Sequence, residues 1–287
     1  MLNYYLKQKV AIVSPKPQTT RHRILGVLTQ ENAQVMFLDT PGLHEPEHAL
    51  GRYMLEAAKG VIEEADLLVT VIDARAGVTD ADQRVFAQVK RALGQSGPGG
   101  RERKAILVIN KADAVKKPKL LPVLDRCAKL GLFTDCIPVS ALTGLQMDVV
   151  LSRIIAELPE GPRWYEPEQQ TDQTDSQRLS ELIREQILAA TREEVPHAVA
   201  VMVEEVEETG RTTKIQATIV VERQGQKAIL IGRGGEMLKQ IGQQARAEIE
   251  RLLGRKVFLG LWVKVAEDWR RDARMLRRLG YSGMEPG

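Results

Sequence analysis

The sequence predicts an α/β protein in which a mainly parallel, doubly wound sheet is followed by a smaller α+β domain. Apolar runs typical of buried parallel strands alternate with helical patterns through the first 157 residues. Short polar motifs directly follow several of these runs, where parallel sheets bind their ligands. Beyond residue 175 the order changes to helix, two strands, two helices and a strand. A chain of 287 residues is long enough for two such domains.

Five strands are expected in the N-terminal domain. The apolar runs lie at 24–28, 35–38, 67–72, 105–109 and 137–139, and helical patterns fall near 50–63, 80–93, 118–130 and 146–157. No helix fits between the first two runs, so we expect these strands to pair antiparallel. The other strands are expected to form parallel βα units.

The segment Leu158-Pro159-Glu160-Gly161-Pro162 ends this pattern and leads into a polar stretch that is typical of a linker. The elements expected after it are a helix at 176–191, strands at 198–206 and 213–222, a short apolar piece at 228–231, a helix at 237–253 and a strand at 257–265. We therefore predict a first domain over 1–163, a linker over 164–175 and a second domain over 176–287.

The net charge is only +3, but basic residues gather late in the chain. Residues 209–278 hold 16 Lys and Arg against seven Asp and Glu, directly after an acidic stretch at 176–208. Such a basic segment is typical of a face that binds a polyanion, and a solvated helical surface is the alternative. No apolar run reaches the length that spans a bilayer, and Cys127 and Cys136 lack metal-site spacing. No arrangement of Ser, His and Asp or of paired carboxylates is evident, so no catalytic residue is assigned.

The motif Asn110-Lys111-Ala112-Asp113 follows a predicted strand and indicates recognition of guanine. The Asp113 carboxylate can accept hydrogen bonds from the ring N–H and the exocyclic amine of guanine, a donor pair that adenine lacks. A mismatched base would leave a desolvated carboxylate unpaired, which discriminates by orders of magnitude. Asn110 is expected to tie neighbouring loops together, and the stem of Lys111 to cover one face of the base.

The motif Asp39-Thr40-Pro41-Gly42 also follows a predicted strand. Alone it is a common turn. Together with the guanine motif it predicts a sensor of Mg²⁺ and γ-phosphate, with Asp39 acting on the metal through a water and the Gly42 N–H facing the phosphate. The preceding segment 15–23 is expected to be a mobile loop, or else an ordinary basic loop. A hydroxyl of Thr19 or Thr20 in it could ligate Mg²⁺, and the residues alone do not distinguish the two.

Two further motifs are too short to indicate a function alone, and their positions in the predicted folds make them candidates. Ser140-Ala141-Leu142 follows the last strand of the first domain and is a candidate for backbone contact with guanine O6. Gly232-Arg233-Gly234-Gly235 lies between two helical pieces of the second domain. A G-x-x-G loop in an α-β-β-α-α-β domain clamps single-stranded RNA, although turns between helices often contain glycine. The following helix carries Lys239 and Arg246, which would favour the same ligand.

Taken together, these motifs resemble the Era family of bacterial GTPases, in which a P-loop-GTPase-like domain is joined to a C-terminal KH domain. The resemblance covers essentially the whole chain. It rests on Lys16-Pro17-Gln18-Thr19-Thr20-Arg21-His22-Arg23, on the four motifs above, on Leu261-Trp262-Val263-Lys264-Val265 and on Leu279-Gly280-Tyr281.

The resemblance implies a GTPase that uses GTP or GDP and Mg²⁺, with Thr20 and Asp39 at the metal. It implies that the KH domain binds small-subunit rRNA near its 3′ end, in the assembly and maturation of the small ribosomal subunit. A monomer in the cytoplasm, peripherally associated with the inner face of the cell membrane, is expected. The residues expected to bind GTP are Thr19, Thr20, Asp39, Thr40, Pro41, Gly42, Asn110, Lys111, Asp113, Ser140, Ala141 and Leu142.

Two features depart from the family pattern. Leu43 follows the D-T-P-G motif, so a Ras-type glutamine would not orient the attacking water. The family's first strand and its G-x-x-x-x-G-K-[ST] loop, the P-loop, do not occur, and Met1–Leu6 is interpreted as the end of the helix that follows this loop in the family. We therefore expect a sequence truncated before that point. The alternative function is a non-enzymatic KH-domain rRNA-binding assembly factor whose GTP-binding domain is inactive for lack of the P-loop.

Overall fold

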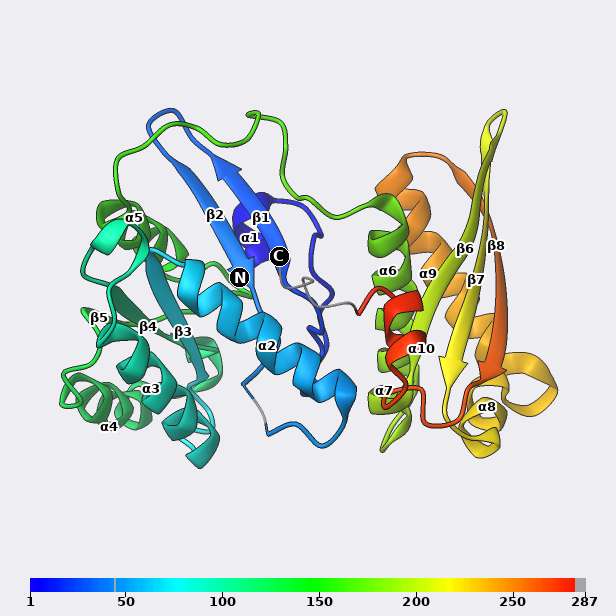
Figure 1. Ribbon diagram of the computed structural model, residues 1–287, viewed down its shortest axis with the longest axis horizontal. Coiled ribbons are helices and arrows are strands. Elements are labelled where there is room, and N and C mark those ends of the chain that lie inside the picture. The colour runs from blue at the N-terminus through cyan, green and yellow to red at the C-terminus, as the bar shows by residue number, and fades with distance from the viewer. Residues whose placement is uncertain (44, 282–287) are drawn as a thin grey trace. The chain divides into compact units, whose positions relative to one another are not determined.

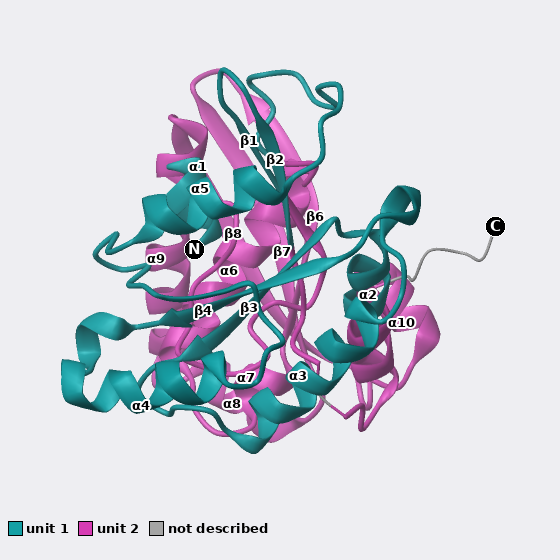
Figure 2. Ribbon diagram, turned by 90° about the vertical axis from the view of Figure 1, so that its left-hand side faces the viewer, with its two compact units in different colours: residues 1–8, 26–38, 58–170 teal, residues 9–25, 39–57, 171–287 magenta. Residues whose placement is uncertain are grey.

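The computed structural model describes residues 1–43 and 45–281, and the chain forms two compact units. The first unit comprises residues 1–8, 26–38 and 58–170, and the second comprises 9–25, 39–57 and 171–287 (Figure 2). Because the chain alternates between the units, each core contains segments that lie far apart in the sequence. The linker at 164–175 and the domain limits on either side of it stay a prediction.

A three-stranded parallel sheet forms the centre of the first unit. Its strands are β3 (Leu67–Asp73), β4 (Lys104–Asn110) and β5 (Asp135–Pro138), in the order β3-β4-β5, and the helices around it include α3 (Asp80–Leu93), α4 (Lys117–Ala128) and α5 (Met147–Glu157). In β4, Ile106 and Val108 pack in a core with α5. Leu107 and Ile109 pack on the opposite side with α3 and α4. Burial on both faces explains why this strand is continuously apolar.

The expected pairing of the first two strands is confirmed. β1 (Ile24–Thr29) and β2 (Gln34–Asp39) are hydrogen-bonded neighbours, and the N–H of Gln30 donates to the carbonyl of Ala33 across the turn between them. Among the described residues this hairpin is a sheet of its own, separate from β3-β4-β5. The α/β class is therefore as predicted, with the hydrogen bonding divided between two sheets.

The short helix α1 (Leu2–Leu6) packs against this hairpin within the first unit. The ring of Tyr5 stacks on Phe37 with 5.2 Å between ring centroids, and its hydroxyl donates to the carbonyl of Met147. A Cβ on Gly26 would lie 2.4 Å from the Cδ1 of Leu2. The close approach of α1 to β1 therefore requires glycine at this position.

The second unit has the predicted α-β-β-α-α-β order. Its elements are α6 (Asp175–Ala190), α7 (Val195–Ala198), β6 (Ala200–Thr209), β7 (Thr212–Val221), α8 (Gln224–Ile231), α9 (Glu236–Leu253), β8 (Lys256–Val265) and α10 (Ala273–Arg278). β6 pairs antiparallel with β7, and β7 pairs parallel with β8. The helices α6 and α9 lie side by side against this sheet (Figure 1).

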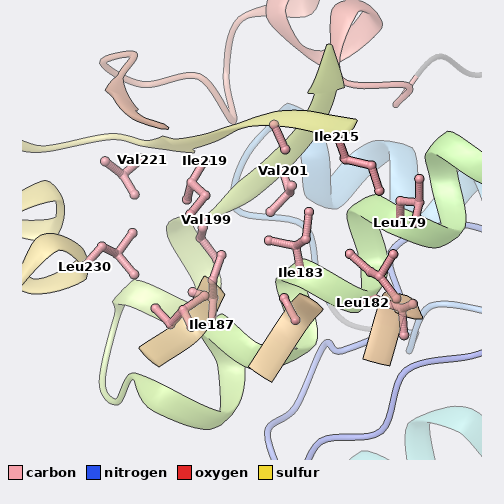
Figure 3. Close-up of a cluster of buried hydrophobic side chains, with 14 of the residues drawn as sticks. Leu179, Leu182, Ile183, Ile187, Val199, Val201, Ile215, Ile219, Val221 and Leu230 are labelled. Carbon is pink, nitrogen blue, oxygen red and sulfur yellow. The ribbon is translucent and has the colours of Figure 1, made fainter. Parts of the chain in front are cut away.

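The core between these helices and the sheet is built from alternating strand residues and helical stripes (Figure 3). Ile215 and Ile219 of β7 face Ile183 and Ile187 of α6, and all four are 0 % exposed. Other buried members of the cluster are Leu179, Leu182, Val199, Val201, Val221, Leu230, Ile241, Ala245 and Ile249.

The opposite face of the same sheet is covered at one end by residues from early in the chain. Leu50 and Met54, at the start of α2 (Ala49–Glu64), pack in a cluster with Ala200, Val220 and Trp269. The second unit therefore includes an N-terminal segment that the predicted domain limits assign to the first domain. Within the described part of the chain, no helix has the length and apolar character needed to cross a membrane.

Replacing Ile183 by Ala is expected to lower the free energy of unfolding of the second unit by about 2–5 kcal/mol, because the cavity lies in a closely packed core. Ile229→Ala is the matched control, since Ile229 is 47 % exposed. Urea titration of both variants would test the assignment. Equal losses of stability in the two variants would contradict the core described above.

Candidate functional site

The side chain of Asn110 joins two loops at the end of the parallel sheet. Asn110 is the last residue of β4, and its Oδ1 accepts hydrogen bonds from the N–H of Lys111 at 2.8 Å and of Ala141 at 3.0 Å. The N–H of Ala112 donates to the carbonyl of Val139 at 2.9 Å. The loops that follow β4 and β5 are thereby fixed to each other, as the sequence predicted for this asparagine.

Lys111 adopts a left-handed backbone conformation with φ 64°, which turns the chain sharply after β4. Its Nζ contacts the Oδ2 of Asp73 at 2.9 Å, and Asp73 is also bound by the guanidinium of Arg75. Hydrogen bonds from Arg75 and Lys111 hold the pKa of Asp73 well below its usual value. Asp113 follows in a short 3-10 turn (Ala112–Ala114) with its side chain exposed.

Asp73 was not predicted as part of the site. It is the last residue of β3 and pairs in register with Asn110, so its position depends on how the two strands align. The sequence feature that could have indicated Asp73 is its position directly after an apolar run, at the end of a predicted strand.

Within Ser140-Ala141-Leu142, two of the three N–H groups already have partners in the protein. The N–H of Ser140 donates to the carbonyl of Leu145, and the N–H of Ala141 donates to Asn110. Ser140 is fully buried, whereas the Leu142 side chain is 87 % exposed. Leu142 is therefore the exposed residue of this motif.

In the second unit, Thr20 and Asp39 meet. The Oγ1 of Thr20 donates to the Oδ2 of Asp39 at 3.3 Å, whereas the Oγ1 of Thr19 donates to the carbonyl of Lys16 at 2.7 Å. The structure thus distinguishes the two threonines, which the sequence alone did not. Pro41 is buried and Gly42 is exposed.

The pair formed by Thr20 and Asp39 suits a hard divalent cation. Burial raises the pKa of the Asp39 carboxyl above its usual value, and the hydrogen bond from Thr20 offsets part of this effect. A carboxylate deprived of water gains from a bound cation, and carboxylate and hydroxyl oxygens are ligands that Mg²⁺ accepts. The residues present therefore fit the metal implied by the sequence motifs.

The predicted nucleotide-binding residues fall into two groups. Asn110, Lys111, Asp113 and the 140–142 loop lie together in the first unit. Thr19, Thr20 and the 39–42 motif lie together in the second.

The G-x-x-G loop lies between α8 and α9, as expected. Gly232, Gly234 and Gly235 have φ values of 73°, 61° and 83°, a region that disfavours other residues. A Cβ on Gly232 would also lie 2.9 Å from the backbone N of Met237. The glycines are thus required by the turn itself.

The basic side chains around this loop point to solvent. Arg233 is exposed, and Lys239 and Arg246 are exposed on α9. Their spacing of seven residues places Lys239 and Arg246 on one face of the helix. The loop and this helix face are therefore the candidate surface for a polyanion.

Two segments of the chain match models of known protein families. Residues 1–111 match a family described as 50S ribosome-binding GTPase, and residues 194–270 match the KH domain family. GTPase Era of Staphylococcus haemolyticus is 41 % identical over 281 residues, covering 98 % of this chain and 91 % of the relative.

Solved structures agree with this comparison. Aquifex aeolicus Era bound to GDP·AlF₄⁻ superposes with a TM-score of 0.91 at 39 % identity, covering 98 % of this chain and 94 % of the other. An Era structure in complex with MgGDPNP and nucleotides 1506–1542 of 16S ribosomal RNA also gives a TM-score of 0.91 at 39 % identity, with coverages of 98 % and 93 %.

The raised pKa of Asp39 predicts a pH-dependent stability. The folded chain binds a proton at Asp39 more readily than the unfolded chain does, so stability falls as pH rises from the usual value of 3.8 through the raised pKa. In metal-free buffer at neutral pH, Asp39→Asn should therefore unfold at a higher temperature than the original chain. Below pH 3.8 the difference should disappear.

Thermal unfolding followed over a pH series would measure this effect. Asp125→Asn serves as the control, since the Asp125 side chain is 63 % exposed and pairs with Lys129. An Asp39→Asn variant that is less stable at neutral pH would contradict the account of this carboxylate.

Proposed function

The chain belongs to the Era family of GTPases, and on this basis we propose that it binds GTP with Mg²⁺, hydrolyses it to GDP and phosphate, and binds small-subunit rRNA through its KH domain. The supporting observation is the double hydrogen bond to Asn110 Oδ1, which fixes the 110–113 and 140–142 loops as one surface. On that surface the exposed Asp113 carboxylate is free to face a ligand.

In this proposal Asp113 selects guanine by accepting from its ring N–H and exocyclic amine. The N–H of Leu142 donates to O6, because the N–H groups of Ser140 and Ala141 are already engaged. The backbone of Lys111 is left-handed, and its amine is bound to Asp73. In this arrangement the aliphatic stem of Lys111 covers one face of the base.

Thr20 and Asp39 would hold the metal, with Asp39 acting through a water. When bound, Mg²⁺ neutralises charge that develops on the phosphate oxygens. The N–H of Gly42, an exposed residue, would face the γ-phosphate. Leu43 offers no group that could orient water, so that role falls to another residue or to the substrate itself.

The KH domain would bind the single-stranded 3′ end of small-subunit rRNA. The left-handed glycines bring the backbone close to the RNA, and Arg233, Lys239 and Arg246 neutralise phosphates. This partner is supported by the family relationship and by the related complex with a 16S ribosomal RNA fragment. We propose that the RNA interaction serves assembly and maturation of the small subunit. A monomeric state, a cytoplasmic location and peripheral association with the membrane stay predictions from the sequence.

Calorimetric titration of the folded 287-residue chain with GTP and Mg²⁺ tests the enzymatic proposal. Saturable binding, followed by release of phosphate, is the expected result. Retained RNA binding without GTP binding would instead identify a non-enzymatic rRNA-binding factor.

Replacing Asp113 by Asn should shift base preference from GTP toward XTP, because the amide can donate to the extra carbonyl oxygen of xanthine. The ratio of the GTP and XTP dissociation constants should change by orders of magnitude, as expected when a buried polar pairing is reversed. Asp125→Asn is the matched control. An unaltered GTP preference in the Asp113 variant would rule out the assigned base contact.

Replacing both Arg233 and Gly234 by Asp should weaken RNA binding at least about tenfold through repulsion of phosphates. The probe is RNA equivalent to nucleotides 1506–1542 of 16S ribosomal RNA. The control is Gly210→Asp with Arg211→Asp, which makes the same charge change in the β6–β7 turn, where Gly210 also has a positive φ and open space around it. Equal effects of the two double variants would locate the RNA elsewhere, and a flat salt dependence would argue against a phosphate-dominated interface.

A further inference from the structure

We propose that Arg184 on α6 is a positioning residue for Thr20, so that the metal-binding threonine is set in place by the unit that contains the KH domain. The proposal rests on the proposed function, since it takes Thr20 as a ligand of Mg²⁺. Arg184 does not contact the metal-binding atoms themselves. It acts through the backbone carbonyl of Thr19, which belongs to the peptide group that precedes Thr20.

The guanidinium of Arg184 binds two partners through Nε and Nη2, while its buried Nη1 has no hydrogen-bond partner among the described residues. Its Nε and Nη2 donate to the two carboxylate oxygens of Glu181 at 2.8 Å and 2.6 Å, and Nη2 also donates to the carbonyl of Thr19. The Arg184 side chain is 1 % exposed. The fork on Glu181 fixes the plane of the guanidinium, and the guanidinium in turn fixes the peptide between Thr19 and Thr20.

Arg21 binds the same segment on the other side of Thr20. Its guanidinium donates to the carbonyls of Val199 at 2.6 Å, His197 at 3.1 Å and Pro196 at 3.2 Å, and the residue is 3 % exposed. Thr20 therefore lies between two buried guanidinium contacts, one at the residue before it and one at the residue after it.

A third contact binds the start of the segment to the end of α6. The Nζ of Lys16 donates to the carbonyls of Leu188 and Thr191. These carbonyls lie at the C-terminal end of the helix, where unpaired oxygens and the helix dipole favour a cation. The segment expected from its composition to be a mobile loop is thus bound at three positions within six residues.

The charge arrangement favours positioning over stability as the role of Arg184. Burial alone would raise the pKa of Glu181, but the charge and hydrogen bonds of Arg184 lower it below its usual value, so the pair is ionised. A buried ion pair contributes little net stability, because desolvation offsets much of the attraction. The ion pair does, however, fix the orientation of the Thr19 carbonyl, which an apolar pair of side chains could not do.

The chain that follows Asp39 is held in the same unit. The N–H of Leu50 donates to the carbonyl of Arg270, and Arg270 pairs with Glu222 of the KH domain at 2.6 Å. The segment that begins at Asp39 is therefore also attached to the C-terminal part of the chain. Thr20 and Asp39 approach to 3.3 Å within this unit.

The test compares Arg184→Lys and Lys16→Met with the unsubstituted 287-residue chain. Lysine keeps a positive charge beside Glu181 but cannot donate in the same fork to Glu181 and to Thr19. Lys16→Met removes a second contact and leaves no buried carboxylate unpaired, so it remains informative if Arg184→Lys folds poorly. Arg153→Lys is the matched control, because Arg153 makes a half-exposed pair with Asp135 in the first unit.

Two measurements are made on each protein. Hydrogen exchange over residues 15–23 in nucleotide-free chain reports the order of the segment directly. Titration with GDPNP in Mg²⁺, and with GDP in excess chelator, separates metal-dependent binding from binding of the base and the diphosphate.

Both test variants should exchange faster over 15–23 and bind Mg²⁺-GDPNP about tenfold more weakly, a loss of about 1.4 kcal/mol. Their affinity for GDP without metal, and all values for Arg153→Lys, should be unchanged. Unchanged exchange, or equal losses for the two nucleotides, would overturn the positioning role while leaving the proposed function intact. A failure of the original chain to bind either nucleotide would overturn the proposed function and this inference with it.

Discussion

The burial of β4 on both faces determines where the first unit can place polar chemistry. Ile106–Ile109 are completely enclosed, so after Lys104 at its start the strand carries no polar side chain until Asn110, where the chain leaves the sheet. Asn110 then uses its side-chain oxygen to bind the loop that follows the neighbouring strand. The surface proposed to recognise the base is thus held by an extension of a packed core, in addition to the contacts within its own loops.

In the second unit, both faces of one sheet are covered by other parts of the chain. One face is covered by α6 and α9, and the opposite face is covered at one end by the start of α2 and by Trp269. This second cluster is what brings the segment after Asp39 into the unit of the KH domain. Hydrogen bonds to the segment before Thr20 and an apolar cluster at the start of α2 therefore join these parts of the chain to the unit of the KH domain, in addition to the chain itself.

Most elements could be predicted from the sequence, because each depends on a local pattern. The strand at 105–109 and the helix at 237–253 agree with β4 and α9 to within a residue, since continuous burial and helical periodicity are visible in short windows. The separation of the β1–β2 hairpin from the parallel sheet was not visible, because it depends on pairing between distant strands. The Lys111–Asp73 contact was missed for the same reason.

The candidate site shows the same limit. Motifs identified Asn110 and Asp39, but two adjacent threonines could not be ranked, because their hydroxyls are distinguished only by what lies next to each one. The guanidinium contacts of Arg21 and Arg184 join residues more than 160 positions apart, and no local spacing predicts them.

The alternation of the chain between its two units has a consequence for folding during synthesis. The chain passes from one unit to the other five times, and the second unit includes a hydrogen bond between residues 178 positions apart. Contacts of such long range form slowly, because a large loop must close before they contribute. Residues 9–25 and 39–57 leave the ribosome early, but their partners emerge only after the whole first unit has been made. The segments proposed to bind the metal are therefore among the last to reach their final structure, and the nascent chain completes them only once its KH domain is complete.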